Sequence, residues 1–305
     1  MNDKAIKPNK YDVREPGDHK QTKEKLRQLN FFGGNYTSKS RFISVDNPTY
    51  DAYAEKYQAK TPISQALYIF AYLLPGIVAY LLVNIEPVHQ FLSNAVGLKG
   101  YNFQYYMFVF FTLGWHMALP IFMLRKHEKL NWKEVFEFLS LNRFSFKEVL
   151  LVAPIAFALS VILSLPYMMT LYEPFQKWLS TVPALQIPSY SIFASYEAFY
   201  GAPAIVMIIM LIGNFVGEEI YFRGYLMKKT AFLGRYNWIV NSILFCAYHL
   251  WQVPQTWPLI VPFIFFGLTM QLRKNLYTMI VFHLLFNIAG VQIYHILLDL
   301  GAGTH

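Results

Sequence analysis

Residues 149–172 read VLLVAPIAFALSVILSLPYMMTLY, a stretch of 24 residues without Asp, Glu, Lys or Arg. A helix needs about 20 apolar residues to cross the hydrocarbon core of a bilayer, so this stretch is long enough to span a membrane. Comparable charge-free runs occur at residues 61–85, 100–124, 236–272 and 275–298. The run at residues 236–272 has 37 residues, which is long enough for two crossings with a turn near Pro254. The sequence therefore predicts an all-α, polytopic transmembrane helix bundle.

The number of crossings follows from these runs and from a further apolar stretch that begins at Ala202. Together they predict seven spanning helices, at about residues 63–85, 102–124, 148–170, 203–227, 237–253, 257–272 and 276–298. Residues 178–196 are also free of charge, but they contain Ser, Thr, Gln and several prolines. We interpret this segment as lying at the outer membrane interface, with an eighth span as the alternative.

Lys and Arg are distributed unevenly between the two sides of such a bundle. The N-terminal segment and the loops after the second, fourth and sixth helices hold 23 of them, whereas the opposite loops hold only Lys99 and Lys177. Cytoplasmic loops of membrane proteins carry the excess of Lys and Arg. The sequence therefore predicts a cytoplasmic N-terminus and an integral, multi-pass protein, and we expect a bacterial cell membrane.

The composition excludes several other classes of protein. Only 14% of the 305 residues are charged, and the net charge of +8 is explained by the cytoplasmic loops, so no nucleic-acid partner is needed. We expect three regions: a polar cytoplasmic tail at 1–62, N-terminal transmembrane helices and the outer interfacial segment at 63–200, and C-terminal transmembrane helices at 201–300. Cys246 is the only cysteine, and we interpret it as a packing residue.

The fourth predicted helix contains three ionisable residues where the membrane tolerates them poorly: Glu218, Glu219 and Arg223. Charged groups at the centre of a spanning helix cost several kcal/mol together and are kept mainly where they face a bundle interior or a water-filled cavity. Glu219 and Arg223 are four residues apart on one helix face and can neutralise each other. Glu218 lies about 100° away around the helix and has no such partner. Its carboxylate is therefore available for catalysis. For this helix alone, an equally good interpretation is that the three residues form a buried polar cluster that fixes helix packing.

Two other helices supply polar groups at a similar depth: His249 in the fifth, and His283 and Asn287 in the seventh. At about 1.5 Å per helical residue, these three and Glu218 lie roughly 13–21 Å from the nearest cytoplasmic basic residue. We therefore expect the four side chains to converge near the middle of the bilayer, with no helix broken.

A carboxylate, two imidazoles and a carboxamide can activate water and stabilise an oxyanion, which favours peptide hydrolysis. A divalent metal such as zinc, bound by Glu218, His249 and His283, is the alternative to metal-free catalysis. The His-Glu-x-x-His signature of zinc proteases is absent from the sequence.

Three motifs in this order resemble the signature of the CPBP family, the CAAX-type intramembrane endopeptidases and bacteriocin-processing (Abi) proteins. They are Glu218-Glu219-x-x-x-Arg223, Phe245-x-x-x-His249 and His283-x-x-x-Asn287. The resemblance covers about residues 203–298, and the flanking Phe222-Arg223-Gly224-Tyr225-Leu226 resembles the bacterial branch. It implies that Glu218 is the water-activating base and that His249 is a second catalytic residue. It also implies that His283 and Asn287 serve the oxyanion or water site, with Glu219 and Arg223 as a supporting pair.

The resemblance leaves the activity open between two classes. The first hypothesis is an intramembrane endopeptidase acting on a peptide or protein at the bilayer. The resemblance implies either a metalloprotease mechanism or a metal-free, glutamate-type mechanism for it. The second is a non-catalytic member, such as a bacteriocin immunity factor or a scaffold for a sensor kinase. A proton-coupled transporter ranks last because no inverted repeat is apparent. We interpret His116 as a packing residue or a loosely hydrated one, and Gly213 and Gly217 as a small-xxx-small pair that permits close helix packing.

Overall fold

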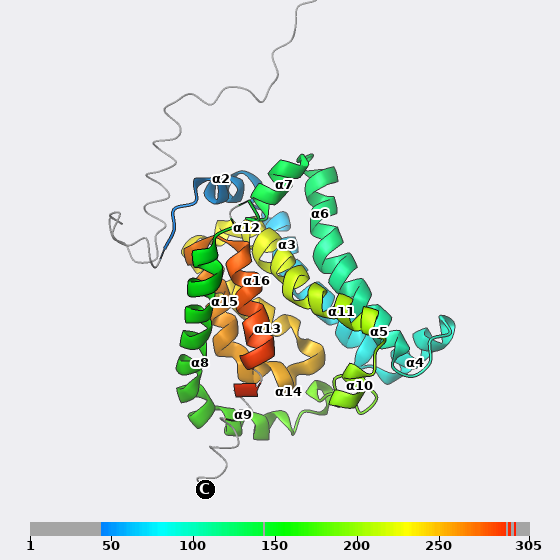
Figure 1. Ribbon diagram of the computed structural model, residues 1–305. Coiled ribbons are helices and arrows are strands. Elements are labelled where there is room, and N and C mark those ends of the chain that lie inside the picture. The colour runs from blue at the N-terminus through cyan, green and yellow to red at the C-terminus, as the bar shows by residue number, and fades with distance from the viewer. Residues whose placement is uncertain (1–43, 143, 291, 294–295, 297–305) are drawn as a thin grey trace, which may run out of the picture. The chain divides into compact units, whose positions relative to one another are not determined.

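The computed structural model describes residues 44–142, 144–290, 292, 293 and 296. Within these ranges the chain forms helices joined by turns, and no strand occurs (Figure 1). Most of the predicted cytoplasmic tail and the end of the seventh predicted helix lie outside the described residues.

Five helical stretches are long and apolar enough to cross a membrane, as an integral membrane protein requires. They are Pro62–Val83, Asn102–His127, Glu148–Thr170, Ala204–Lys229 and Leu250–Arg273. Side chains such as Ile63, Leu150 and Ile205 expose their apolar surface on the outside of the bundle. Because such a surface is unfavourable in water, these stretches support the prediction of an integral membrane protein, and they cover five of the seven predicted spans.

The stretches consist of consecutive α-helical, π-helical and 3₁₀ segments. The first stretch is the single helix α3 (Pro62–Val83). The second consists of α5 (Asn102–Val109), η2 (Phe110–Ala118), α6 (Leu119–Phe122) and η3 (Met123–His127). The third consists of η4 (Glu148–Val152) and α8 (Ala153–Thr170). The fourth is α11 (Ala204–Ile212), η6 (Gly213–Gly217), η7 (Glu219–Leu226) and α12 (Met227–Lys229). The last is η9 (Leu250–Gln252), α14 (Val253–Thr256), η10 (Trp257–Leu259) and α15 (Ile260–Arg273).

The fifth predicted helix differs from the expectation of an unbroken helix over residues 237–253. After the 3₁₀ turn η8 (Ala231–Tyr236), helix α13 (Asn237–Tyr248) ends immediately before His249, whose backbone has φ −80° and ψ 40°. Three short helical turns lead from there to α15, and Pro254 and Pro258 within them lack the amide hydrogen that a continuous helix would use. The expectation that no helix is broken at the site was therefore wrong.

The seventh predicted helix is described as α16 (Leu276–Leu285) followed by the π-helical η11 (Phe286–Gly290). α13 packs between α3 and α15, while α8 covers α15 and α16 (Figure 1). The interior positions of these helices therefore face one another, which buries the motifs of the second half of the chain.

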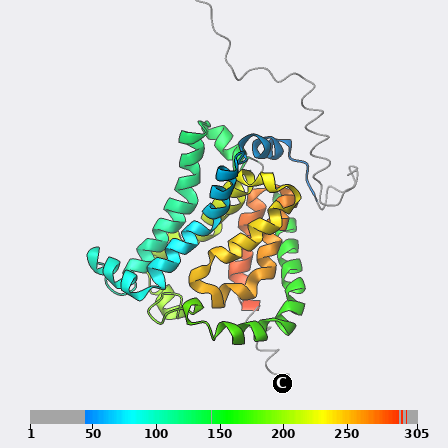
Figure 2. The same ribbon diagram turned by 180° about the vertical axis from the view of Figure 1, so that it is seen from behind.

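Short helices cover the two ends of the bundle. α2 (Pro48–Tyr57) and α7 (Trp132–Phe138) lie at the end where α12 ends (top of Figures 1 and 2). α4 (Glu86–Ala95), α9 (Tyr172–Leu179) and α10 (Tyr196–Tyr200) lie at the opposite end. Residues 180–195, which the structure describes throughout, form only the 3₁₀ turn η5 (Pro183–Leu185). An eighth span in residues 178–196 is therefore contradicted, because no helix of membrane length forms there.

Two glycines allow the helices around the centre to approach closely. A methyl group on Gly213 would lie 2.1 Å from Cβ of Thr112 in η2, and one on Gly76 in α3 would lie 1.9 Å from the carbonyl oxygen of Tyr248. Both distances are shorter than any van der Waals contact, so only glycine fits. The prediction that Gly213 permits close helix packing is confirmed, and the same approach brings η2 and α3 against the site.

Candidate active site

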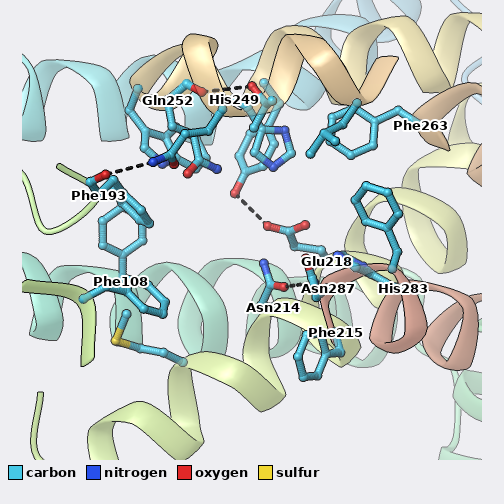
Figure 3. Close-up of a pocket in the computed structure, with 18 of the residues that line it drawn as sticks. Phe108, Phe193, Asn214, Phe215, Glu218, His249, Gln252, Phe263, His283 and Asn287 are labelled. Carbon is cyan, nitrogen blue, oxygen red and sulfur yellow. Dashed lines mark hydrogen bonds between the residues drawn. The ribbon is translucent and has the colours of Figure 1, made fainter. Parts of the chain in front are cut away.

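A cavity of about 550 Å³ lies between η2, the fourth stretch, the end of α13 and α16. All four residues expected to converge line it: Glu218, His249, His283 and Asn287. Figure 3 shows the carboxylate of Glu218 pointing toward the side of the cavity where His249 lies, with Asn214 and Asn287 on the other side. The four side chains thus line one cavity, with Glu218 from the fourth stretch, His249 from the end of α13, and His283 and Asn287 from α16 and η11.

Glu218 has few polar partners despite its burial. Its side chain is 3% exposed, and Oε1 accepts a hydrogen bond from the hydroxyl of Tyr248 over 3.4 Å. Oε2 has no hydrogen-bond partner among the described residues. A buried polar atom without a partner is costly in a folded protein. An oxygen of this kind in a cavity marks a place where a water or a substrate group is expected.

Glu218 lies between two π-helical segments, η6 and η7. π-Helical turns inside α-helices are rare and occur frequently at functional sites. Neighbouring helical residues point about 100° apart, so Glu218 and Glu219 enter different environments although they are adjacent in the chain.

Glu219 belongs to a buried network with Arg223 and His283. Its Oε1 accepts hydrogen bonds from NH1 of Arg223 over 3.2 Å and from Nδ1 of His283 over 2.9 Å. The guanidinium also stacks on Phe245, with its central carbon 3.8 Å from the ring centroid. The ion pair that the i, i+4 spacing predicts is present, and it also fixes the orientation of the His283 imidazole.

His249 occupies the first position after α13, where the helix has ended. Its Nδ1 is 2.8 Å from the carbonyl oxygen of Phe245, and its ring stacks on Phe263 with centroids 5.4 Å apart. Because a carbonyl oxygen can only accept, Nδ1 carries the hydrogen, and in a neutral imidazole Nε2 keeps a free lone pair. The break in the helix and this hydrogen bond together define the orientation of the ring.

Asn287 lies in η11 and donates from Nδ2 to Oδ1 of Asn214 over 2.8 Å. Asn214 precedes Glu218 by one helical turn, so the two amides connect η11 to the helix that carries the carboxylate. An amide nitrogen has two hydrogens, which leaves Asn287 one N–H for another partner.

Sequence reasoning missed three residues near Glu218: Asn214, Tyr248 and His116. The hydroxyl of Tyr248 lies 3.2 Å from Nε2 of His116, which is buried in η2 against the rings of Tyr221 and Phe222. The interpretation of His116 as a packing residue is therefore incomplete, because its ring is packed but also hydrogen-bonded. The i, i+4 spacing of Asn214 and Glu218 is a sequence signal for the first of the three, whereas the contact with His116 depends on helix packing.

The alternative to metal-free catalysis is a divalent metal bound by Glu218, His249 and His283. Among the described residues, no group of three or more His, Cys, Asp or Glu side chains is arranged to hold a metal ion. Glu218, His249 and His283 share a cavity, but they do not form a ligand set as they stand.

The fold and the cavity define a class: an integral membrane protein with a buried carboxylate, two imidazoles and an amide around one internal cavity. Residues 200–289 match the family described as type II CAAX prenyl endopeptidase Rce1-like. This match confirms the resemblance to the CAAX-type intramembrane endopeptidases and supports a protease activity in general. A search of the curated proteins found no match. A search of the solved structures found none either.

Proposed function

We propose that this protein is an intramembrane endopeptidase that hydrolyses a peptide bond of a membrane-associated peptide or protein with water activated by Glu218. The observation that carries the proposal is Oε2 of Glu218, a buried carboxylate oxygen that lines a cavity and has no hydrogen-bond partner among the described residues. The family match over residues 200–289 supports the choice of a peptide bond.

In the first step, Oε2 of Glu218 accepts a proton from water while the water oxygen attacks the scissile carbonyl carbon. Nε2 of His249 accepts a hydrogen bond from the other O–H of the same water, since Nδ1 already donates to Phe245. A base and a second acceptor orient the water and raise its nucleophilicity.

The attack places a negative charge on the carbonyl oxygen. We assign the remaining N–H of Asn287 and Nε2–H of protonated His283 as its hydrogen-bond donors. The carboxylate of Glu219, 2.9 Å from Nδ1 of His283, stabilises the protonated imidazole. Arg223 balances the charge of Glu219, which makes Glu219 and Arg223 the supporting pair.

In the last step, the proton held by Glu218 passes to the leaving amine nitrogen as the C–N bond breaks. The carbonyl double bond forms again, and the products are a new carboxylic acid, which keeps the second proton of the water, and a new amine. Glu218 returns to its ionised form, so the cycle needs only water and substrate.

The other end of the cavity indicates the kind of substrate. It is lined by a cluster of aromatic side chains, namely Phe108, Phe111, Phe193 and Phe199. Trp251 connects this cluster to the site, because its ring lies 5.9 Å from that of Phe108 and 5.3 Å from that of His249. A cavity of about 550 Å³ is of the size that holds a small ligand or a few residues of a peptide. We propose that the substrate carries a bulky apolar group beside the scissile bond.

We further propose seven crossings with the N-terminus in the cytoplasm of a bacterial cell. α13 has 12 residues and covers about 18 Å, and we assign it and the stretch Leu250–Arg273 to two consecutive crossings that meet just after His249. The distribution of 23 against two basic residues supports the orientation.

The test compares purified wild type with Glu218→Gln and His249→Ala in proteoliposomes that contain membrane peptides. Wild type should generate new termini, detected by mass spectrometry, while both variants remain folded and lose cleavage. Glu55→Gln, an exposed site on α2, is the matched control and should cleave like wild type. Equal cleavage by all four proteins would contradict the proposal, and a Glu218→Gln variant that keeps the cellular phenotype would favour the non-catalytic alternative.

A further inference from the structure

Three buried side chains from three helices form a hydrogen-bonded row that ends at Glu218. The hydroxyl of Tyr248 lies 3.4 Å from Oε1 of Glu218 and 3.2 Å from Nε2 of His116. His116 is 1% exposed and Tyr248 is 2% exposed. Neither residue belongs to the three sequence motifs, and the steps proposed above do not use them.

The chemistry of the groups fixes the direction of the hydrogen bonds. An ionised carboxylate only accepts, so the single hydrogen of the Tyr248 hydroxyl is donated to Glu218. The hydroxyl oxygen then accepts from Nε2–H of His116. Nδ1 of His116 has no partner among the described residues, which fits a neutral ring with its hydrogen on Nε2.

The row leaves the two oxygens of Glu218 with different surroundings. Oε1 is held by Tyr248, whereas Oε2 is unpartnered and belongs to a residue that lines the cavity. A carboxylate held at one oxygen cannot turn freely about its last bond. The oxygen that meets water is therefore the same one in every catalytic cycle.

We infer that Tyr248 and His116 are positioning residues that orient the Glu218 carboxylate toward the attacking water. This inference rests on the proposed function, since it concerns the same base. The backbone supports it: Gly76 lets α3 pack directly on the carbonyl of Tyr248, and the rings of Tyr221 and Phe222 hold His116.

The experiment is a double-mutant cycle of Tyr248→Phe and His116→Phe, measured as kcat and KM on the peptide substrate. Tyr248→Phe removes one hydrogen bond to a charged group, so kcat should fall about ten- to hundredfold while KM changes little. His116→Phe alone should lower kcat less. In the Tyr248→Phe background, His116→Phe should lower kcat almost no further, because the hydroxyl that links His116 to Glu218 is already gone.

Two further variants separate positioning from packing. His116→Gln keeps an N–H donor for the Tyr248 hydroxyl and should restore most of the kcat that His116→Phe loses. Tyr221→Phe is the matched control: its hydroxyl is also buried and hydrogen-bonded, to Ala71 and Trp115, but not to Glu218. It should lower the unfolding temperature in detergent without changing kcat. If Tyr248→Phe does not fold, the comparison of His116→Phe with His116→Gln decides the question.

Infrared spectroscopy gives a readout that does not depend on activity. The difference spectrum between wild type and Glu218→Gln identifies the carboxyl band of Glu218, and Tyr248→Phe should shift that band while Tyr221→Phe leaves it in place. An unshifted band, or a wild-type kcat for Tyr248→Phe, would overturn the inference. If the wild type itself does not cleave the peptide, this result contradicts the proposed function and not the positioning of Glu218.

Discussion

Glu218 and Glu219 are adjacent residues with opposite surroundings, and they should respond differently to the same substitution. Glu219→Gln leaves Arg223 buried without its carboxylate and removes the acceptor of His283. Loss of one partner of a buried ion pair costs about 3–5 kcal/mol. Thermal unfolding in detergent should therefore show a large loss of stability for Glu219→Gln. Glu218→Gln should unfold close to the wild-type temperature, because the original carboxylate has no cationic partner; equal destabilisation of the two would contradict this assignment.

Asn287 provides a second test at single residues. If its free N–H binds the oxyanion, Asn287→Ala should lower kcat by about 10²–10³-fold with little change in KM, as for other single oxyanion donors. Asn94→Ala, on the exposed surface of α4, is the control and should keep wild-type kinetics. A rise in KM at unchanged kcat would instead assign Asn287 to substrate binding.

Among the helices, the contact between η6 and η2 depends on the missing side chain of Gly213. Gly213→Ala would place a methyl group 2.1 Å from Cβ of Thr112, so the two helices must separate and the carboxylate that follows must move. We expect a lower unfolding temperature and lower kcat, partly restored by Thr112→Gly. Gly114→Ala in η2, the segment that contains Thr112, is the control, because its methyl group would meet the movable ring of Phe110 at 3.3 Å. Equal effects of the two alanines would show that the close approach is unimportant.

Helix geometry also explains how far the sequence could predict this site. The pair of Glu219 and Arg223 follows from spacing within one helix, and the shared cavity of Glu218, His249 and His283 agrees with counting residues from the basic loops. The end of α13 at His249 was missed because the prolines that disfavour a continuous helix come five and nine residues later. The contact of His116 with Tyr248 spans 132 residues and depends on the rotation of two helices about their axes, which a single sequence does not reveal.

For the molecule as a whole, the orientation in the membrane can be measured by thiol labelling, because Cys246 is the only cysteine in the sequence. In a Cys246→Ala background, Lys133→Cys on α7 and Lys177→Cys on α9 each introduce one exposed thiol at opposite ends of the bundle. An impermeant maleimide applied to intact cells should label Lys177→Cys alone, and Lys133→Cys should react only after the cells are opened. The reverse pattern would invert the proposed topology.

The residues that border the aromatic part of the cavity include Phe193, Ser195 and Gln255, beside α10 and α14 at the end of the bundle opposite α2 and α12 (Figure 1). If the basic loops face the cytoplasm as proposed, this end of the cavity lies on the side of the cell exterior. The chain would then meet its substrates after they have begun to leave the cell, so that cleavage is coupled to export. A charged inhibitor that cannot cross the bilayer should consequently stop the reaction in intact cells.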